Sequence, residues 1–178
     1  INDYGPTETC VHAVAHVYDT EDGNIIPIGR PYPNKKIYVL QGDKLCGIGQ
    51  KGEICIAGTG LARSYHNRPE LTEQFFVKNP FADGRLYRTG DIGYFAPTGE
   101  LYYEGRADSQ VKIRGFRIEP EEIANRIREY QAIKDAAVVS RTDDGEPYLA
   151  AYFASSEEID TASLKVYLSE RLPAYMVP

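Results

Sequence analysis

Apolar and polar residues in the first part of the chain follow short, β-prone runs. Strands are predicted at 11–18, 36–40, 53–57, 86–88 and 101–104. Glycine, proline, asparagine and aspartate separate these runs, as turn residues do between antiparallel strands. One helix is expected at 69–75, because Pro69 suits a first helical position. This pattern predicts a small, mostly antiparallel β unit.

The pattern changes after Gly105-Arg106. Short strands are expected at 110–114 and 116–118, then a helix from Pro120 that has two glutamates in its first turn, where carboxylates favour the helix dipole. Further strands are expected at 136–140 and 149–153, and a second helix is expected at about 161–171. The second part therefore predicts a compact α+β unit. The boundary is expected near residues 107–109.

Composition excludes several classes of protein. The chain has 178 residues, of which 42% are hydrophobic and 26% are charged, as in a soluble globular protein. Its net charge of −6 argues against a nucleic-acid surface, which needs a concentrated basic face. No apolar run approaches the roughly 20 residues that span a bilayer. The three cysteines form no CxxC pair, so we expect no disulfide framework and a cytoplasmic setting.

Both ends of the chain interrupt patterned sequence. Ile1 leads directly into a turn-rich segment, and Pro178 follows Tyr175-Met176-Val177 without a polar tail. A natural chain rarely starts and stops in this way. We expect the sequence to be a fragment.

The segment Asn2-Asp3-Tyr4-Gly5-Pro6-Thr7-Glu8 has two interpretations. Gly-Pro is common in an ordinary turn that follows a strand. The same seven residues also place an aromatic face, a hydroxyl and a carboxylate around one tight turn. Such a set could stack on a base, hydrogen-bond a phosphate and hold Mg²⁺, which prefers oxygen ligands.

Other candidate motifs are less specific. The segment 58–63 is glycine-rich, but it lacks the spacing of a P-loop or of GxGxxG, so we assign it to a structural turn. Asp91 is expected at the end of a strand, either as a turn residue or as an acceptor for two ribose hydroxyls. A metal site at His12 and His16, on one strand face, is disfavoured because no third ligand is near. Cys10 is expected to be a small buried residue.

Four cations lie within twelve residues between Arg106 and Arg117. This stretch is either a solvated patch or a hinge followed by a loop that meets a phosphate-bearing partner.

Together these segments resemble the adenylation domains of nonribosomal peptide synthetases, within the larger family of adenylate-forming enzymes. Five blocks match in order: NDYGPTE from Asn2, GEICIAGTGLARSY from Gly52, YRTGDI from Tyr87, GRADSQVKIRGFRIE from Gly105 and LPAYMVP from Leu172. The match covers essentially the whole chain. It implies a mixed α/β fold. Residues 1–107 would form the carboxy-terminal part of the large adenylation core, including a small distorted antiparallel β-barrel. Residues 108–178 would form a small mobile α+β subdomain that stops before its catalytic lysine.

The resemblance also implies a nucleotide site. Tyr4 would stack on adenine beside Gly5, Thr7 would contact the α-phosphate, and Glu8 would help to hold Mg²⁺. Asp91 would bind the ribose near Arg106, and Tyr103 would line the same pocket.

The remaining roles concern the substrate and the hinge. Asp3, Val11 and His12 match positions that line the amino-acid pocket. Val11-His12 resembles some pockets for small hydroxylated residues, whereas Asp3 would suit a cationic or hydroxylated substrate. Asp108 would be the hinge between the adenylating and the thioester-forming arrangements.

The implied function is ATP-dependent amino-acid adenylation in an intact parent enzyme. The aminoacyl-AMP would then be loaded as a thioester on the phosphopantetheine of a peptidyl carrier protein, among neighbouring synthetase domains. The phosphate loop and the lysine of the family lie outside this sequence, so we expect the isolated chain to be inactive. The alternatives are a D-alanine–carrier protein ligase and a non-catalytic docking fragment.

Overall fold

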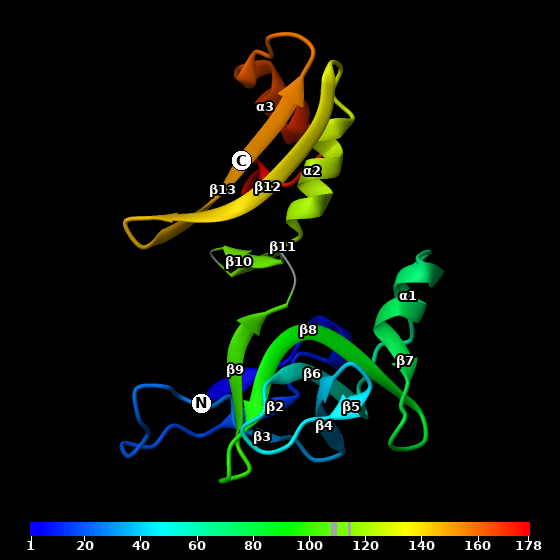
Figure 1. Cartoon of the computed structure of the whole chain (residues 1–178), viewed down its shortest axis with the longest axis vertical. Coiled ribbons are helices and arrows are strands. Elements are labelled where there is room, and N and C mark those ends of the chain that lie inside the picture. Colours follow the sequence, from blue (N-terminus) through cyan, green and yellow to red (C-terminus); the bar gives the residue numbers. More distant parts are fainter. Residues whose placement is uncertain (108–109, 114) are drawn as a thin grey trace. The chain divides into compact units, whose positions relative to one another are not determined.

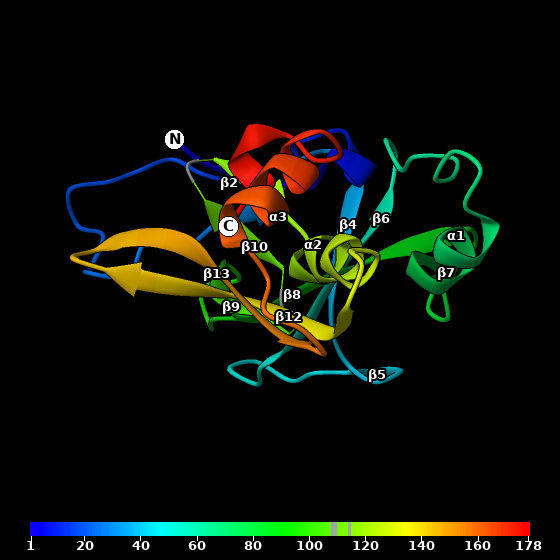
Figure 2. The same ribbon diagram turned by 90° about the horizontal axis from the view of Figure 1, so that it is seen from above.

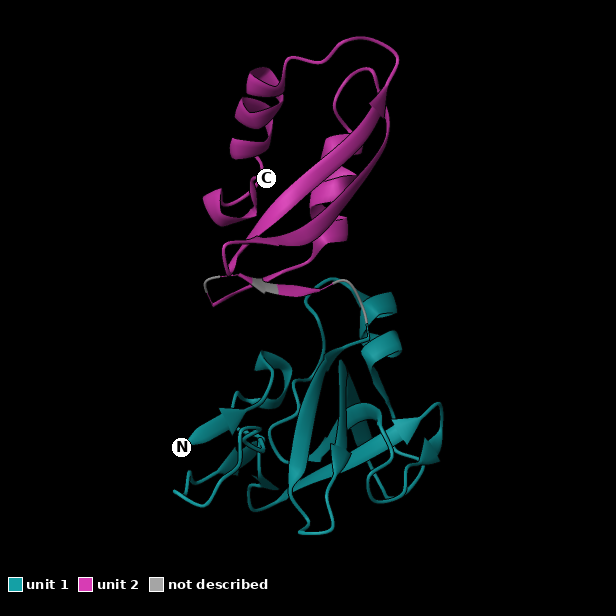
Figure 3. Cartoon of the chain, turned by 60° about the vertical axis from the view of Figure 1, so that its left-hand side comes forward, with its two compact units in different colours: residues 1–107 teal, residues 108–178 magenta. Residues whose placement is uncertain are grey.

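The structure is a computed structural model, and it describes all residues except 108, 109 and 114. The chain forms two compact units, Ile1–Ala107 and Asp108–Pro178 (Figure 3). Each unit has a hydrophobic core of its own. No helix among the described residues is long and apolar enough to cross a membrane.

The first unit contains two antiparallel sheets (Figure 1). The smaller sheet has the order β1-β2-β3, with bounds Asn2–Tyr4, Val14–His16 and Arg30–Pro31. The larger sheet has the order β5-β4-β6-β8-β7, and β9 also pairs with β8. Its strands are β4 (Lys35–Gln41), β5 (Lys44–Leu45), β6 (Gly52–Gly58), β7 (Phe76–Lys78), β8 (Arg85–Phe95) and β9 (Leu101–Arg106). Helix α1 (Pro69–Phe75) precedes β7, and a short 3₁₀ helix, η1, spans Thr7–Thr9.

Successive side chains of β6 point to opposite faces of the larger sheet, and apolar residues are buried on both faces. Ile54 and Ile56 are fully buried in a cluster that also contains Val14 and Leu101. Cys55 and Ala57 point to the opposite face of β6 and pack in a second cluster. A bridge between Gly29 and Leu101 joins the smaller sheet to β9. This core fixes β1, β8 and β9 as one framework.

The second unit packs two helices on a long hairpin. The hairpin consists of β12 (Ile133–Asp143) and β13 (Glu146–Ser155), and α2 (Pro120–Arg128) packs on β12. Figure 2 shows α2 and α3 (Thr161–Ser169) on the same side of this hairpin. A small ladder of β10 (Val111–Ile113) and β11 (Phe116–Ile118) precedes α2, and a 3₁₀ turn, η2, spans Ala174–Met176. The core of this unit includes Ile123, Ile127, Leu164 and Leu168.

The mixed α/β fold with a curled antiparallel sheet is confirmed, but some predicted bounds are wrong. The strand expected at 11–18 is limited to Val14–His16, because Cys10 and Val11 have φ angles of 61° and 64°. Left-handed backbone cannot continue a strand. Strand β8 continues to Phe95, so Asp91 lies inside it rather than at its end.

Candidate nucleotide site

The turn after β1 depends on Gly5. A Cβ atom at this position would lie 2.0 Å from the backbone oxygen of Val11, so only glycine fits without a backbone shift. The amide of Ala13 donates to the carbonyl oxygen of Tyr4 at 2.9 Å. This close crossing of two backbone segments places Tyr4 at the end of β1 and starts η1 immediately after it.

Tyr4, Asp91 and Arg106 meet at one carboxylate. The hydroxyl of Tyr4 donates to Asp91 Oδ2 at 2.5 Å, and Arg106 Nη1 donates to Asp91 Oδ1 at 2.9 Å. Asp91 and Arg106 are directly paired between β8 and β9. The ring of Tyr103 lies 6.3 Å from that of Tyr4, centre to centre. The fold therefore brings together four residues predicted to bind the nucleotide.

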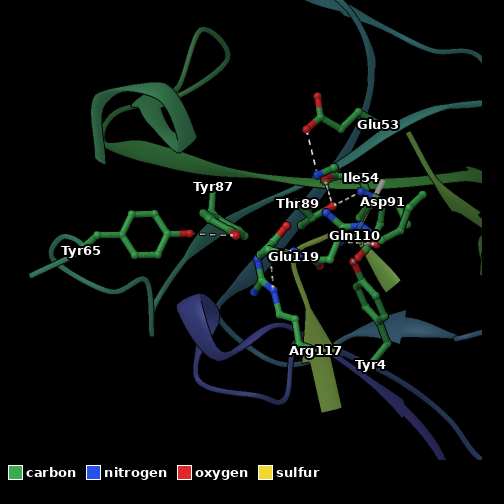
Figure 4. Close-up of polar contacts among 12 residues, drawn as sticks. Tyr4, Glu53, Ile54, Tyr65, Tyr87, Thr89, Asp91, Gln110, Arg117 and Glu119 are labelled. Carbon is green, nitrogen blue, oxygen red and sulfur yellow. Dashed lines mark hydrogen bonds and ion pairs between the residues drawn. The ribbon is translucent and has the colours of Figure 1, made fainter. Parts of the chain in front are cut away.

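The backbone around Asp91 is also anchored. Its amide donates to Thr89 Oγ1 at 2.9 Å, and the Thr89 hydroxyl donates to the carbonyl of Ile54 at 2.7 Å (Figure 4). Asp91 is only 8% exposed. Burial, together with the charge of Asp91, raises the pKa of Tyr4, so its hydroxyl remains a donor.

Glu8 lies on η1 and is held from a distant part of the chain. It is 8% exposed, and the hydroxyl of Tyr65 donates to its Oε1 at 2.7 Å. The amide of Ala62 donates to its carbonyl oxygen at 2.8 Å. Thr7, one residue earlier, is exposed.

The donor set of this turn suits Mg²⁺ bound together with a nucleotide. Among the described residues, no three histidine, cysteine or acidic side chains gather into a metal cluster. Mg²⁺ is commonly held by one or two carboxylates plus substrate phosphates rather than by an all-protein cage. The single carboxylate of Glu8 fits that mode.

Asp3 and His12 form a second polar cluster. Nδ1 of His12 lies 2.5 Å from Asp3 Oδ2, and the hydroxyl of Tyr32 lies 3.4 Å from the same oxygen. Val11 is next to this cluster in sequence, and it is 56% exposed. The structure thus pairs two of the three residues predicted to line the amino-acid pocket.

Two other predictions about this region are wrong. His12 and His16 do not share a strand face, because His12 lies outside β2. His16 instead contacts Asp22 at 2.7 Å and Glu100 at 2.8 Å. Cys10 is exposed rather than buried, because its left-handed backbone ends η1 and turns the side chain outward.

The structural turn predicted at 58–63 is confirmed. Gly58 has a φ of 98° at the end of β6, and the amide of Thr59 donates to the carbonyl of Asn34 at 3.0 Å. Asp108, the predicted hinge, lies outside the described residues. In the cationic stretch, Arg117 pairs with Glu119 at 3.6 Å. Sequence reasoning missed the contact between Tyr65 and Glu8, for which no local pattern exists.

Comparisons with known proteins identify sequences and structures that are similar to this chain. Residues 1–66 match the family model of AMP-binding enzymes. Bacitracin synthase 1 of Bacillus licheniformis is 50% identical over the whole chain, which covers 3% of that protein. An artificially fused adenylation-PCP di-domain, NpsA-ThdA from Klebsiella oxytoca, is 30% identical with a TM-score of 0.77, over 98% of this chain and 34% of that one.

Another similar protein has been solved with ligands bound. The four-domain nonribosomal peptide synthetase AB3403, solved bound to AMP and glycine, is 45% identical with a TM-score of 0.56. The alignment covers 99% of this chain and 14% of AB3403. The chain therefore spans only a small part of the relatives that it matches. Its first 66 residues match the AMP-binding enzyme family, and its whole length is similar to one segment of nonribosomal peptide synthetases.

Proposed function

We propose that the intact protein containing this chain activates an amino acid with ATP. The substrate carboxylate oxygen attacks the α-phosphorus, the bond to pyrophosphate breaks, and an aminoacyl-AMP forms. The acyl group then passes to the phosphopantetheine thiol of a peptidyl carrier protein, and AMP leaves. The observation that carries this proposal is the convergence of Tyr4 and Arg106 on Asp91, with the ring of Tyr103 beside that of Tyr4.

Each residue of this constellation has a task that its chemistry permits. An ionised carboxylate has about four lone-pair sites, so Asp91 can accept from ribose hydroxyls while it accepts from Tyr4 and Arg106. Tyr4 and Tyr103 supply aromatic faces for adenine. Base–aromatic stacking contributes about 1–3 kcal/mol per base in comparable sites.

The turn after Gly5 meets the phosphates in this proposal. Thr7 donates its exposed hydroxyl to the α-phosphate, and Glu8 would hold Mg²⁺. When bound, Mg²⁺ would supply charge stabilisation for the pyrophosphate leaving group. Thr7 and Glu8 act by positioning and by electrostatics, which contribute most in a site that excludes water.

The Asp3–His12 pair, with Val11 beside it, contributes to the amino-acid pocket. A carboxylate at the pocket wall favours a side chain that is cationic or that carries a hydroxyl. A carrier protein and neighbouring synthetase domains are the expected partners, by analogy with the fused Klebsiella oxytoca protein, which contains adenylation and PCP domains. Asp108 serves as the hinge between the two half-reactions.

The isolated 178-residue chain is expected to form no adenylate. It spans 34% of the Klebsiella oxytoca di-domain, and the phosphate loop and lysine of the family are not in its sequence. The removal of one preorganised donor commonly lowers the rate by about 10²–10³.

The test is amino-acid-dependent exchange of pyrophosphate into ATP by the intact protein. A panel of amino acids that includes D-alanine, followed by loading of the carrier protein, separates peptide synthesis from D-alanine ligation. We expect exchange with one or a few L-amino acids and transfer to the carrier. A folded protein that binds its carrier but supports no exchange with any amino acid would favour the docking interpretation.

A further inference from the structure

We infer that Tyr65 is a positioning residue that orients the Glu8 carboxylate toward the metal-bound phosphates of the nucleotide. The inference rests on the proposed function, because it concerns the same site. Tyr65 is 57 residues from Glu8 in sequence, yet its hydroxyl donates to Glu8 Oε1 at 2.7 Å. The contact is charge-assisted, and such bonds are shorter and stronger than neutral ones.

The hydroxyl of Tyr65 lies between two polar neighbours, the Glu8 carboxylate and the hydroxyl of Tyr87. The Tyr87 hydroxyl lies 3.2 Å from that of Tyr65 (Figure 4). A carboxylate only accepts hydrogen bonds, so the phenol proton points to Glu8, and Tyr65 can still accept from Tyr87.

The ring of Tyr65 is fixed on several sides. It makes edge contacts with Phe75 at 6.2 Å and Phe76 at 5.5 Å, centre to centre. The backbone amide of Tyr65 donates to Oγ1 of Thr72, a residue of α1, at 3.0 Å. A hydroxyl on a ring held this firmly can define the position of its acceptor.

The backbone before Tyr65 is connected to the same turn. Ala62 donates its amide to the carbonyl of Glu8 at 2.8 Å. Arg85 donates to the carbonyl oxygens of Ala62 and Arg63 at 3.0 Å and 2.9 Å, which ties this segment to β8. Glu8 is thus held by main chain and side chain at once. The glycine-rich turn of 58–63 has a purpose beyond chain reversal, because it carries the segment that supports Glu8.

The experiment measures binding rather than turnover. Calorimetry of the intact protein with a non-hydrolysable ATP analogue is performed in excess Mg²⁺ and again in EDTA, for wild type and Tyr65→Phe. We expect the variant to bind the magnesium complex about tenfold more weakly, the lower end of the range for a hydrogen bond to a charged group. Its binding in EDTA should equal that of wild type.

Two further variants sharpen the result. Tyr38→Phe is the matched control, since Tyr38 lies on β4 and its hydroxyl meets Asn79 at 3.5 Å. It should bind like wild type under both conditions. In a Glu8→Gln background, Tyr65→Phe should have little additional effect, because the two residues act through one carboxylate.

The outcomes distinguish this inference from the proposed function. Equal binding by Tyr65→Phe and wild type in both conditions would overturn the positioning role while leaving nucleotide binding intact. An equal loss with Mg²⁺ and with EDTA would also overturn it, since Tyr65 would then be a general structural residue. Failure of the wild-type protein to bind the analogue at all would instead count against the proposed function.

Discussion

At the scale of single residues, Asp91 is the point on which the candidate site converges. Its two carboxylate oxygens accept bonds from two different strands, β1 through Tyr4 and β9 through Arg106. A side chain held in this way loses little freedom when a ligand binds, because its geometry is already set. The carboxylate is therefore preorganised for hydroxyl donors.

We predict that Asp91→Ala in the intact protein raises the KM for ATP about 10- to 100-fold, the cost of a lost hydrogen bond to a charged group. The KM for the amino acid should change much less. Steady-state exchange assays at varied ATP and varied amino acid provide the comparison, with Asp83→Ala, an exposed acidic residue of the same unit, as the control. If the KM for ATP stayed unchanged while activity fell, the ribose assignment would be wrong.

A second residue-scale prediction concerns Gly5. Alanine at this position would place its Cβ 2.0 Å from the Val11 backbone oxygen, so the crossing of the two segments must open. We expect Gly5→Ala to lower the free energy of unfolding by about 2 kcal/mol or more. Gly23→Ala is the control, because a Cβ there meets nothing within 4 Å. Equal melting temperatures for the two variants would contradict the steric argument.

At the scale of elements, His16 links three parts of the first unit. It lies on β2, and its two ring nitrogens face Asp22 in the following loop and Glu100 just before β9. A neutral imidazole has one N–H, so donation to both carboxylates needs the imidazolium form. The hydrogen bond with Asp22, and a further one with Glu100, raise the pKa of His16.

The sign of the resulting pH dependence follows from linkage. A histidine whose pKa is raised in the folded state contributes stability fully below its unfolded pKa of about 6.5, and that contribution is lost as pH rises through the folded value. We predict that the wild-type protein melts at a higher temperature than His16→Gln. This difference in melting temperature should be largest at about pH 6 and should shrink toward about pH 9. A difference that is constant or that grows with pH would show that His16 is not protonated in the fold.

The elements were largely predictable from sequence, and the failures have specific causes. Period-two runs predicted β4 and β6, and Pro69 and Pro120 marked the starts of α1 and α2. The alternation of Val11 through Val17 predicted too long a strand, because a local pattern does not report the left-handed backbone at Val11.

Contacts within the site were less predictable. The resemblance named Tyr4 and Asp91, which the fold joins by a hydrogen bond across 87 positions. The Tyr65–Glu8 contact depends on the path of β6, α1 and β8 together. No sequence pattern around either residue encodes such a pairing, since both segments have ordinary local structure.

At the scale of the whole molecule, the chain divides into two units, with the boundary between Ala107 and Asp108. We predict that Asp108→Pro in the intact protein keeps much of its adenylate formation but loses most of its thioester formation. Proline fixes φ at about −65° and restricts the preceding residue, so it would limit rotation at the proposed hinge without removing a proposed nucleotide contact. Pyrophosphate release and carrier loading, measured side by side, provide the test. Equal losses in both half-reactions, with the fold intact by circular dichroism, would mean that Asp108 is an ordinary linker residue.

The separate hydrophobic cores have a consequence for protein engineering. Among the described residues, the buried members of each cluster come from one unit only: 13–101 in the first unit and 113–176 in the second. A chimaera joined between Ala107 and Asp108, with the second half taken from a homologous synthetase, would leave the buried members of these three clusters among their native neighbours. Recombination at this junction should therefore preserve the folding of both halves, whereas a crossover inside β8 would divide one core between two parents.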